Sequence, residues 1–181
     1  MRPEEMREHV EKTERLYSGR VVTLDLYEVT LPDGMTARRE IVQHPGAVAI
    51  VAVDDADHVL LVRQYRTAAD DILLELPAGT LEPGEDPAVC ADRELQEEAG
   101  HKPGQLRAIG GIYAAPGYTT EYVHLFIATE LKPSRLDADA DEFIETVRLP
   151  LADALAMIDD GTIQDSKTVA GLLRAARLLN R

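Results

Sequence analysis

Residues 79–101 read GTLEPGEDPAVCADRELQEEAGH, and they hold the most specific pattern in this chain of 181 residues. Within them, Asp86 is a favourable N-cap, Pro87 suits the first helical position, and Gly100 is a natural helix terminator. We therefore expect a helix from about Pro87 to Ala99. The residues of this helix that we expect to bury against a sheet are Ala88, Ala91, Leu95 and Ala99.

The same helix would carry three glutamates on one face, because Glu94, Glu97 and Glu98 occupy positions i, i+3 and i+4. Like charges four residues apart cost a helix about 0.2–0.5 kcal/mol per pair, so a divalent cation between them would explain the grouping. Hard cations such as Mg²⁺ prefer carboxylate and carbonyl oxygens and bridge to substrate phosphates. The alternative is a solvated acidic face, which is the usual meaning of a charge run. The glycines and Arg93 at fixed offsets favour the metal site.

The whole pattern has the spacing G-x5-E-x7-R-E-U-x-E-E-x-G-U, in which U is a bulky aliphatic residue. Seven identities and one hydrophobic position match it, and chance would produce such a match roughly once in 10^9 start points. The pattern resembles the Nudix box of nucleoside-diphosphate-X hydrolases, although His101 departs from it at the last U position. The resemblance implies an α/β/α Nudix sandwich with a mixed sheet and N-terminal β-hairpin strands. The residues to which it gives structural roles in the box are Gly79, Glu85, Arg93 and Gly100.

The composition is that of an acidic protein with an ordinary apolar content. Hydrophobic residues make up 45% and charged residues 29%, and the formal net charge is −14. Such a charge argues against nucleic acid and anionic membranes as partners. No apolar run is long enough to span a bilayer, and the N-terminus is too charged for a secretory signal. Cys90 is the single cysteine and cannot form an intramolecular disulfide, so we expect a reducing, cytoplasmic setting.

The rest of the sequence predicts strands and helices around the box. We expect a short charged helix or a frayed arm over residues 1–14, and a β-hairpin over residues 20–43 around the turn Pro32–Gly34. Two helices are expected at about 150–160 and 166–180, so that a mixed sheet carries helices on both faces. Apolar segments predict strands at 46–53, 59–66, 72–76, 106–115, 121–131 and 144–149.

Segments outside the box indicate a branch of the family. Those that resemble the ADP-ribose pyrophosphatase branch are REIV (39–42), LVRQYR (61–66), LLELPAGTLEPGE (73–85), APGYTTE (115–121) and DSKTVAGLL (165–173). The substrate contacts implied by this resemblance are Arg39, Glu40, Arg66, Pro116 and Gly117. Each has another interpretation. Pro116–Gly117 would be a plain turn, Arg66 a partner of Asp70, and Arg39 an exposed strand residue.

The resemblance also implies how the box would act. The carbonyl of Ala78 would hold divalent ions together with Glu94 and Glu98, with Glu97 as a further ligand. Mg²⁺ is the expected ion and Mn²⁺ a substitute. Such ions neutralise a diphosphate and lower the pKa of a water molecule that attacks phosphorus. Arg93 would face away from the ions and pair with Glu85.

The group that deprotonates this water is expected on the acidic loop DADADEFIE (137–145). Glu142 is the first candidate, and the alternatives are Asp141, Asp139 or a glutamate of the box. A plain acidic surface loop is the competing interpretation. The catalytic residues that follow from this assignment are Glu97, Glu98 and Glu142.

These expectations combine into Mg²⁺-dependent hydrolysis of ADP-ribose, a small nucleoside diphosphate sugar, to AMP and ribose 5-phosphate. One alternative is hydrolysis of another nucleoside diphosphate sugar, such as GDP-mannose. A second is a non-catalytic module that senses ADP-ribose, although the complete set of carboxylates argues against it. The resemblance further implies a homodimer of a single Nudix domain over residues 1–181, with residues 15–43 at the interface and residues 44–181 as the core.

Overall fold

The computed structural model describes residues 2–137 and 143–180. The chain divides into two compact units. The first unit consists of Met1–Pro45 and Tyr113–Glu121, and the second of Gly46–Ile112 and Tyr122–Arg181. The Nudix-box pattern therefore lies entirely in the second unit.

The first unit is built on a three-stranded antiparallel sheet in the order β1-β2-β3. A short 3-10 helix, η1 (Pro3–Met6), precedes β1 (His9–Ser18), β2 (Thr23–Thr30) and β3 (Thr36–Gln43). The expected hairpin is confirmed as β2 and β3. Of the short charged helix or frayed arm expected over residues 1–14, only the 3-10 helix η1 is present, and the expectation is wrong from His9 onward, because β1 pairs with β2 along its whole length. All ten residues of β1 are exposed, so backbone pairing and not an apolar stripe specifies this strand.

The loop 113–121 belongs to the same unit because it is hydrogen-bonded to the end of β3. The N–H of Val42 donates to the carbonyl of Tyr118 at 2.8 Å, and the N–H of Thr120 donates back to Val42 at 3.0 Å. Within the loop, the N–H of Tyr118 donates to the carbonyl of Ala115 at 3.1 Å. The turn expected at Pro116–Gly117 is therefore present.

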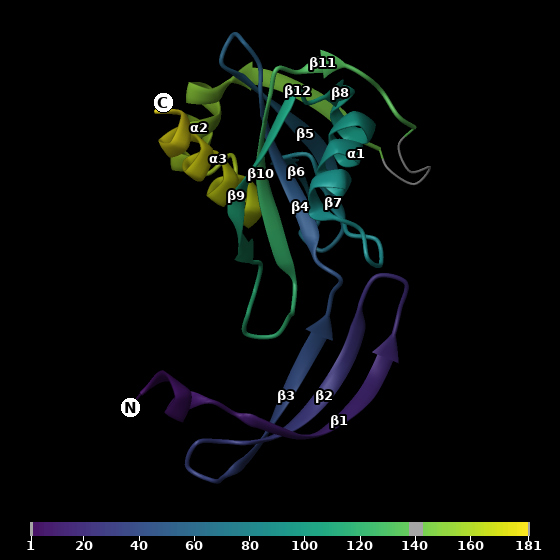
Figure 1. The fold of residues 1–181 in the computed structure, drawn as a ribbon, viewed down its shortest axis with the longest axis vertical. Coiled ribbons are helices and arrows are strands. Elements are labelled where there is room, and N and C mark those ends of the chain that lie inside the picture. Colours follow the sequence, from purple (N-terminus) through teal and green to yellow (C-terminus); the bar gives the residue numbers. More distant parts are fainter. Residues whose placement is uncertain (1, 138–142, 181) are drawn as a thin grey trace. The chain divides into compact units, whose positions relative to one another are not determined.

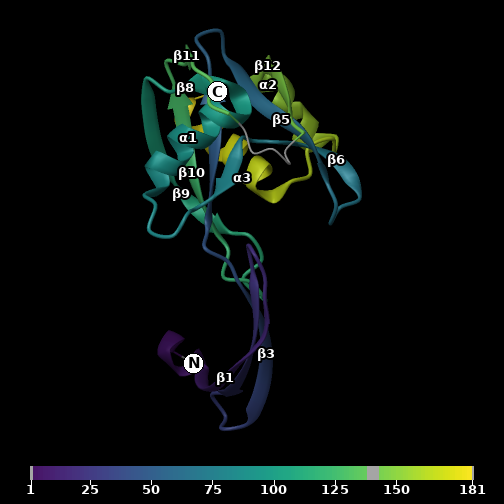
Figure 2. The same ribbon diagram turned by 90° about the vertical axis from the view of Figure 1, so that its right-hand side faces the viewer.

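The second unit contains a seven-stranded mixed sheet with the order β12-β5-β4-β10-β9, in which β6 also pairs with β5 and β7 with β4. Strands β4 and β10 are parallel, whereas β5 is antiparallel to β4, β6 and β12. Figure 2 shows β6 beside the end of β5. The strands are β4 (Ala47–Val53), β5 (His58–Arg66), β6 (Asp71–Glu75), β7 (Ala78–Thr80), β9 (Gln105–Tyr113), β10 (Tyr122–Thr129) and β12 (Glu145–Pro150). A separate small ladder joins β8 (His101–Lys102) to β11 (Lys132–Pro133).

Helices cover both faces of this sheet (Figure 1). Helix α1 (Pro87–Ala99) packs on one face, and α2 (Leu151–Asp159) and α3 (Ser166–Leu179) pack on the other. Strand β4 is buried throughout. Its Val48, Ile50 and Ala52 pack with the α1 face, and the residues between them pack with α2 and α3. The predicted α/β/α sandwich is confirmed. No helix among the described residues is long and apolar enough to cross a membrane.

Candidate active site on helix α1

Helix α1 begins and ends where the sequence predicts. The Oδ1 atom of Asp86 accepts a hydrogen bond from the N–H of Ala88 at 2.8 Å, and Pro87 is the first helical residue. Gly100 ends the helix with φ 66°, a left-handed conformation, and its N–H donates to the carbonyl of Leu95. Glycine adopts this conformation without steric cost. The position of the box glutamates along the helix is therefore fixed by local capping.

Two adjacent columns of residues, each with a spacing of four, form the buried face of α1. One column is Ala91, Leu95 and Ala99, as expected. The expectation that Ala88 is buried is wrong, because Ala88 lies outside both columns and is exposed. The second column consists of Cys90, Glu94 and Glu98. Two glutamates therefore lie on the face of the helix that packs against the protein.

The burial of this second column excludes a solvated acidic face. Glu94 is 8% exposed and Glu98 is 7% exposed. Ionised carboxylates are removed from water only where partners compensate for the lost hydration. Glu97 lies to the side of the column, and its side chain is 20% exposed.

The loop before α1 supplies part of this compensation. The N–H of Ala78 donates to Oε2 of Glu98 at 2.8 Å. The next residue, Gly79, lies so close to Glu94 that a Cβ on it would be 1.9 Å from Cδ of that glutamate. The backbone of β7 therefore packs directly on both buried carboxylates, and a side chain at residue 79 would displace that of Glu94.

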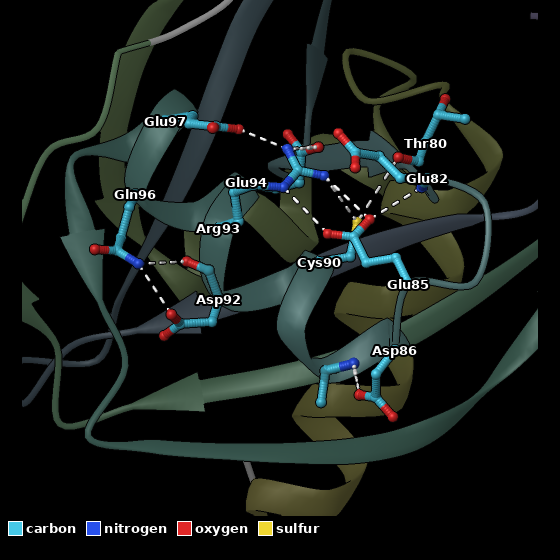
Figure 3. Close-up of polar contacts among 11 residues, drawn as sticks. Thr80, Glu82, Glu85, Asp86, Cys90, Asp92, Arg93, Glu94, Gln96 and Glu97 are labelled. Carbon is cyan, nitrogen blue, oxygen red and sulfur yellow. Dashed lines mark hydrogen bonds and ion pairs between the residues drawn. The ribbon is translucent and has the colours of Figure 1, made fainter.

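Arg93 supplies the positive charge (Figure 3). Its Nη1 donates to Oε1 of Glu94 at 2.7 Å and to Oε2 of Glu97 at 2.8 Å. Its Nε lies 3.2 Å from Oε1 of Glu85. The expected pair with Glu85 is present, and the guanidinium also contacts Glu94 and Glu97, two of the residues expected to hold the ions. Arg93 is adjacent to Glu94 and one turn before Glu97, so its guanidinium reaches all three glutamates.

The pKa values of two neighbours of Arg93, Glu85 and Cys90, are shifted in opposite directions. Burial alone would raise the pKa of Glu85, but hydrogen bonds from Arg93 and from the N–H of Glu82 outweigh it and hold that pKa below its ordinary value. Burial, followed by the charge of Glu94, raises the pKa of the Cys90 thiol to about 12. A thiol that does not ionise is a poor nucleophile. Cys90 therefore acts as a buried helix residue and not as a nucleophile.

The box residues were also expected to hold a divalent metal ion. Over residues 2–137 and 143–180, no three or more His, Cys, Asp or Glu side chains are grouped so as to hold a metal ion. Arg93 contacts Glu94 and Glu97, while the N–H of Ala78 contacts Glu98. The chemistry of the donors nevertheless fits a hard cation, because two buried carboxylates one turn apart lie against loop backbone.

The residues expected to contact substrate are divided between the units. In the second unit, Arg66 forms a bidentate pair with the buried Glu75, with both N···O distances 2.8 Å. The alternative pairing of Arg66 with Asp70 is wrong, because Asp70 accepts from the hydroxyl of Tyr65. Glu75 has no role in the sequence-based expectations, although a lone charge inside the apolar run ILLEL was a visible signal.

The other candidates for substrate contact lie in the first unit. Arg39 in β3 is paired with Glu8 at 2.6 Å, and the neighbouring Glu40 is exposed. Pro116 and Gly117 form the exposed tip of loop 113–121. The structure thus places these four residues on two neighbouring segments of one unit.

Two further expectations concern residues near the end of the box and beyond. His101 replaces an aliphatic residue, and its Nδ1 lies 2.7 Å from the carbonyl of Ala99. The imidazole of His101 is therefore hydrogen-bonded to the last turn of α1. Glu142, Asp141 and Asp139, the candidates for the general base, lie outside the described residues.

Comparison with known proteins identifies the class to which this fold and box belong. The chain belongs to the NUDIX family, because the NUDIX domain matches residues 43–172. The match includes the whole box and the sheet that supports it. Nudix ADP-ribose pyrophosphatases generally depend on a divalent metal ion.

Individual relatives cover most of the chain. The "Methanol dehydrogenase activator" of Bacillus methanolicus is 44% identical over 87% of this chain and 86% of its own. The "ADP-ribose pyrophosphatase" of Bacillus subtilis is 41% identical over 86% of this chain and 85% of its own. A "GDP-mannose pyrophosphatase" of Klebsiella pneumoniae is 36% identical over 79% of this chain and 78% of its own. The crystal structure of an "ADP compounds hydrolase" superposes with a TM-score of 0.85 and 26% identity, covering 96% of this chain and 95% of that one.

Proposed function

We propose that this protein hydrolyses the diphosphate linkage of ADP-ribose, with Mg²⁺, to AMP and ribose 5-phosphate. The observation that carries the proposal is the buried pair Glu94 and Glu98 on α1, held against the backbone of Ala78 and Gly79. Burying two carboxylates one turn apart costs stability unless positive partners compensate for the lost hydration. A bound cation would be such a partner. A module that only sensed ADP-ribose would have no need of the two carboxylates.

In the proposed reaction a water molecule attacks one phosphorus of the diphosphate in line with the bridging oxygen. A bond forms between the water oxygen and that phosphorus, and the bond to the bridging oxygen breaks. The bridging oxygen leaves with the second phosphate, and the water gives up its proton. We assign that proton to Glu142, with Asp141, Asp139 or a glutamate of the box as alternatives.

The metal is assigned to the box residues. The carbonyl of Ala78 with Glu94 and Glu98 would hold it, and Glu97 would be a further ligand. When bound, Mg²⁺ supplies charge neutralisation for the diphosphate and acidifies a water molecule, and Mn²⁺ is expected to substitute. Arg93 buttresses this set, because its single guanidinium contacts three of the box glutamates.

The substrate assignment rests on the segments that flank the box and on the relatives. Arg66 in β5 is the proposed phosphate contact, since a guanidinium binds phosphate oxygens in a bidentate manner. The relative from Bacillus subtilis is named for ADP-ribose, and its identity to this chain exceeds that of the relative named for GDP-mannose. GDP-mannose or another nucleoside diphosphate sugar is the alternative substrate.

A substrate panel with identified products tests the proposal. The purified protein would be incubated with ADP-ribose or GDP-mannose in Mg²⁺, and the released nucleotides separated by chromatography. AMP and ribose 5-phosphate from ADP-ribose, suppressed by a chelator, are expected. Preferential release of GMP from GDP-mannose would favour the alternative substrate, and binding of ADP-ribose without turnover would favour the sensor.

We also propose that the protein is a homodimer formed through the first unit. Among the described residues of that unit, the buried ones are Asp25 and Val29. An exposed edge strand and a small buried core call for a partner surface. Its exposed large hydrophobic residues are Met6, Val10, Leu16, Tyr17, Val21, Met35, Tyr113 and Tyr118. A second copy of the chain is the partner that we propose for these residues.

In this dimer Arg39 and Glu40 would serve the active site of the neighbouring copy, with Pro116 and Gly117 close to the substrate. Light scattering tests the assembly, and a fully active monomer would contradict it. We also propose a cytoplasmic setting, because the single cysteine cannot form an intramolecular disulfide.

A further inference from the structure

An ion-pair network centred on a buried glutamate joins β5, β6 and α3, and the proposed reaction assigns no role to it beyond that of Arg66. Its centre is Glu75, the last residue of β6, which is 1% exposed. The two carboxylate oxygens of Glu75 accept from Nε and Nη2 of Arg66. The same carboxylate also accepts from Nζ of Lys167 in the first turn of α3. Glu75 therefore joins two cations that are far apart in the sequence.

The residues at the start of α3 hold the chain just ahead of the box loop. Asp165 caps the helix by accepting from the N–H of Thr168 at 2.9 Å, and it lies 3.1 Å from Nζ of Lys167. The hydroxyl of Thr168 accepts from the N–H of Leu76 at 2.8 Å. Leu76 directly follows Glu75 and lies two residues before Ala78, whose N–H binds Glu98. Residues 165–168 (DSKT) thus hold the segment that leads into the box, through the hydrogen bond between Leu76 and Thr168.

The bidentate pair leaves one edge of the Arg66 guanidinium available. Glu75 takes Nε and one N–H of Nη2, and no acceptor from the described part of the chain engages Nη1. The side chain of Arg66 is 41% exposed. The negative charge of Glu98 acts on this guanidinium. The Arg66 guanidinium therefore lies within electrostatic range of Glu98 in the box.

Lys167 changes the net charge around the pair of Arg66 and Glu75. A pair of Arg66 and Glu75 alone is neutral and attracts an anion weakly. Lys167, whose side chain is 15% exposed, offsets the charge of Glu75, while Asp165 is stabilised at the helix N-terminus. Burial alone would raise the pKa of Glu75, but the hydrogen bond from Arg66 and the charge of Lys167 outweigh it and lower that pKa. Glu75 stays ionised and keeps Arg66 in one orientation.

We propose that Lys167 and Glu75 are positioning residues for the diphosphate, because they hold Arg66 with its Nη1 edge directed to the phosphate oxygens of a nucleoside diphosphate. The inference rests on the proposed function, since it requires a diphosphate substrate. Lys167 does not touch the substrate and acts through Arg66. This role explains why the first turn of α3 carries a partly buried, paired lysine.

A double-mutant cycle on KM tests this role. The proteins are the wild type, Lys167→Met, Arg66→Ala and the double variant, assayed with ADP-ribose and Mg²⁺. Lys167→Met is expected to raise KM at least about tenfold and to change kcat by less than about threefold, because an oriented phosphate contact contributes to binding throughout the reaction. In the Arg66→Ala background the same substitution should change KM by less than about twofold.

Conservative and control variants separate positioning from general destabilisation. Lys167→Arg restores the cation and should recover most of the lost KM. Lys132→Met makes the same chemical change at an exposed lysine of the second unit and should leave the kinetics unchanged. Thermal unfolding of each protein reports whether it is folded. If Lys167→Met does not fold, Lys167→Gln loses the charge but keeps an N–H donor, and the same results are expected.

Two outcomes would overturn the inference: equal increases in KM with and without Arg66, or an unchanged KM in a folded Lys167 variant. Either result in an active wild-type enzyme leaves the proposed function standing. A wild type that hydrolyses no nucleoside diphosphate sugar would instead overturn the proposed function, and this inference with it.

Discussion

Gly79 and Glu94 are in such close contact that a Cβ on the glycine would lie 1.9 Å from Cδ of the glutamate and 1.9 Å from its Oε1. The contact joins β7 to the buried column of α1, so a side chain at position 79 would displace the Glu94 carboxylate from its present position. The first glycine of the box therefore keeps this carboxylate in place.

Gly79→Ala should separate the loop from Glu94 and lower turnover of ADP-ribose by about 10²-fold, since displacements near 1 Å have that effect on catalytic groups. Steady-state kinetics and thermal unfolding measure the two consequences. Gly161→Ala is the matched control, because no atom lies within 4 Å of a Cβ there, although its φ is +81°. It should lower stability slightly and leave turnover intact. Wild-type turnover in Gly79→Ala would show that the contact is dispensable.

Cys90 should resist thiol reagents while the protein is folded. It is fully buried, and burial together with the charge of Glu94 raises its pKa to about 12. At pH 8 its thiolate population is then roughly 10³-fold below that of an ordinary cysteine. Labelling with iodoacetamide, followed by mass spectrometry, should give no adduct in the native protein and full labelling in denaturant. Rapid native labelling would contradict the burial of the second column.

Glu75→Gln should change how stability depends on pH. The folded-state pKa of Glu75 lies below its ordinary value of 4.5, so the ionised group stabilises the fold above that pH. This contribution is lost as the pH falls through the folded-state pKa. Breaking a fully buried pair costs about 3–5 kcal/mol at neutral pH, and the cost here should be smaller because the side chain of Arg66 is 41% exposed. Urea unfolding should show a large difference between wild type and variant at pH 7 and a smaller one near pH 3.

The opposite trend would contradict the assignment of Glu75 as a buried anion. A difference that grew at acid pH would mean that the carboxylate is protonated in the folded protein. Glu82→Gln, at an exposed position of the box loop, is the control. Its unfolding free energy should follow that of the wild type at both pH values.

The local elements were predictable from sequence because local chemistry specifies them. The bounds of α1 follow from Asp86, Pro87 and Gly100, whose capping preferences do not depend on the rest of the fold. The mixed sheet follows from apolar runs of strand length. Strand β1 was missed because its residues are all exposed, and a strand specified by pairing alone has no apolar periodicity.

The ion pairs of the site were predictable only in part, because most depend on distant elements. Arg93 and Glu85 lie within one motif, and their pair was expected. Arg66 was expected to pair with Asp70 if it did not bind substrate, since the two are close in sequence. Its actual partner, Glu75, lies at the far end of β6, where the register pairs Glu75 with Val62 and Arg66 with Asp71. Lys167 reaches Glu75 only through the packing of α3. No sequence spacing reveals such contacts.

The role of the buried carboxylates in hydrolysis is tested most directly by Glu98→Gln, assayed for AMP released from ADP-ribose in Mg²⁺. The N–H of Ala78 donates to Oε2 of Glu98 at 2.8 Å, and a glutamine keeps an oxygen acceptor for it, so the fold should be retained. Removing the charge should lower turnover on the order of 10³-fold, with an unchanged midpoint of thermal unfolding. A folded Glu98→Gln protein that releases AMP at the wild-type rate would contradict the account.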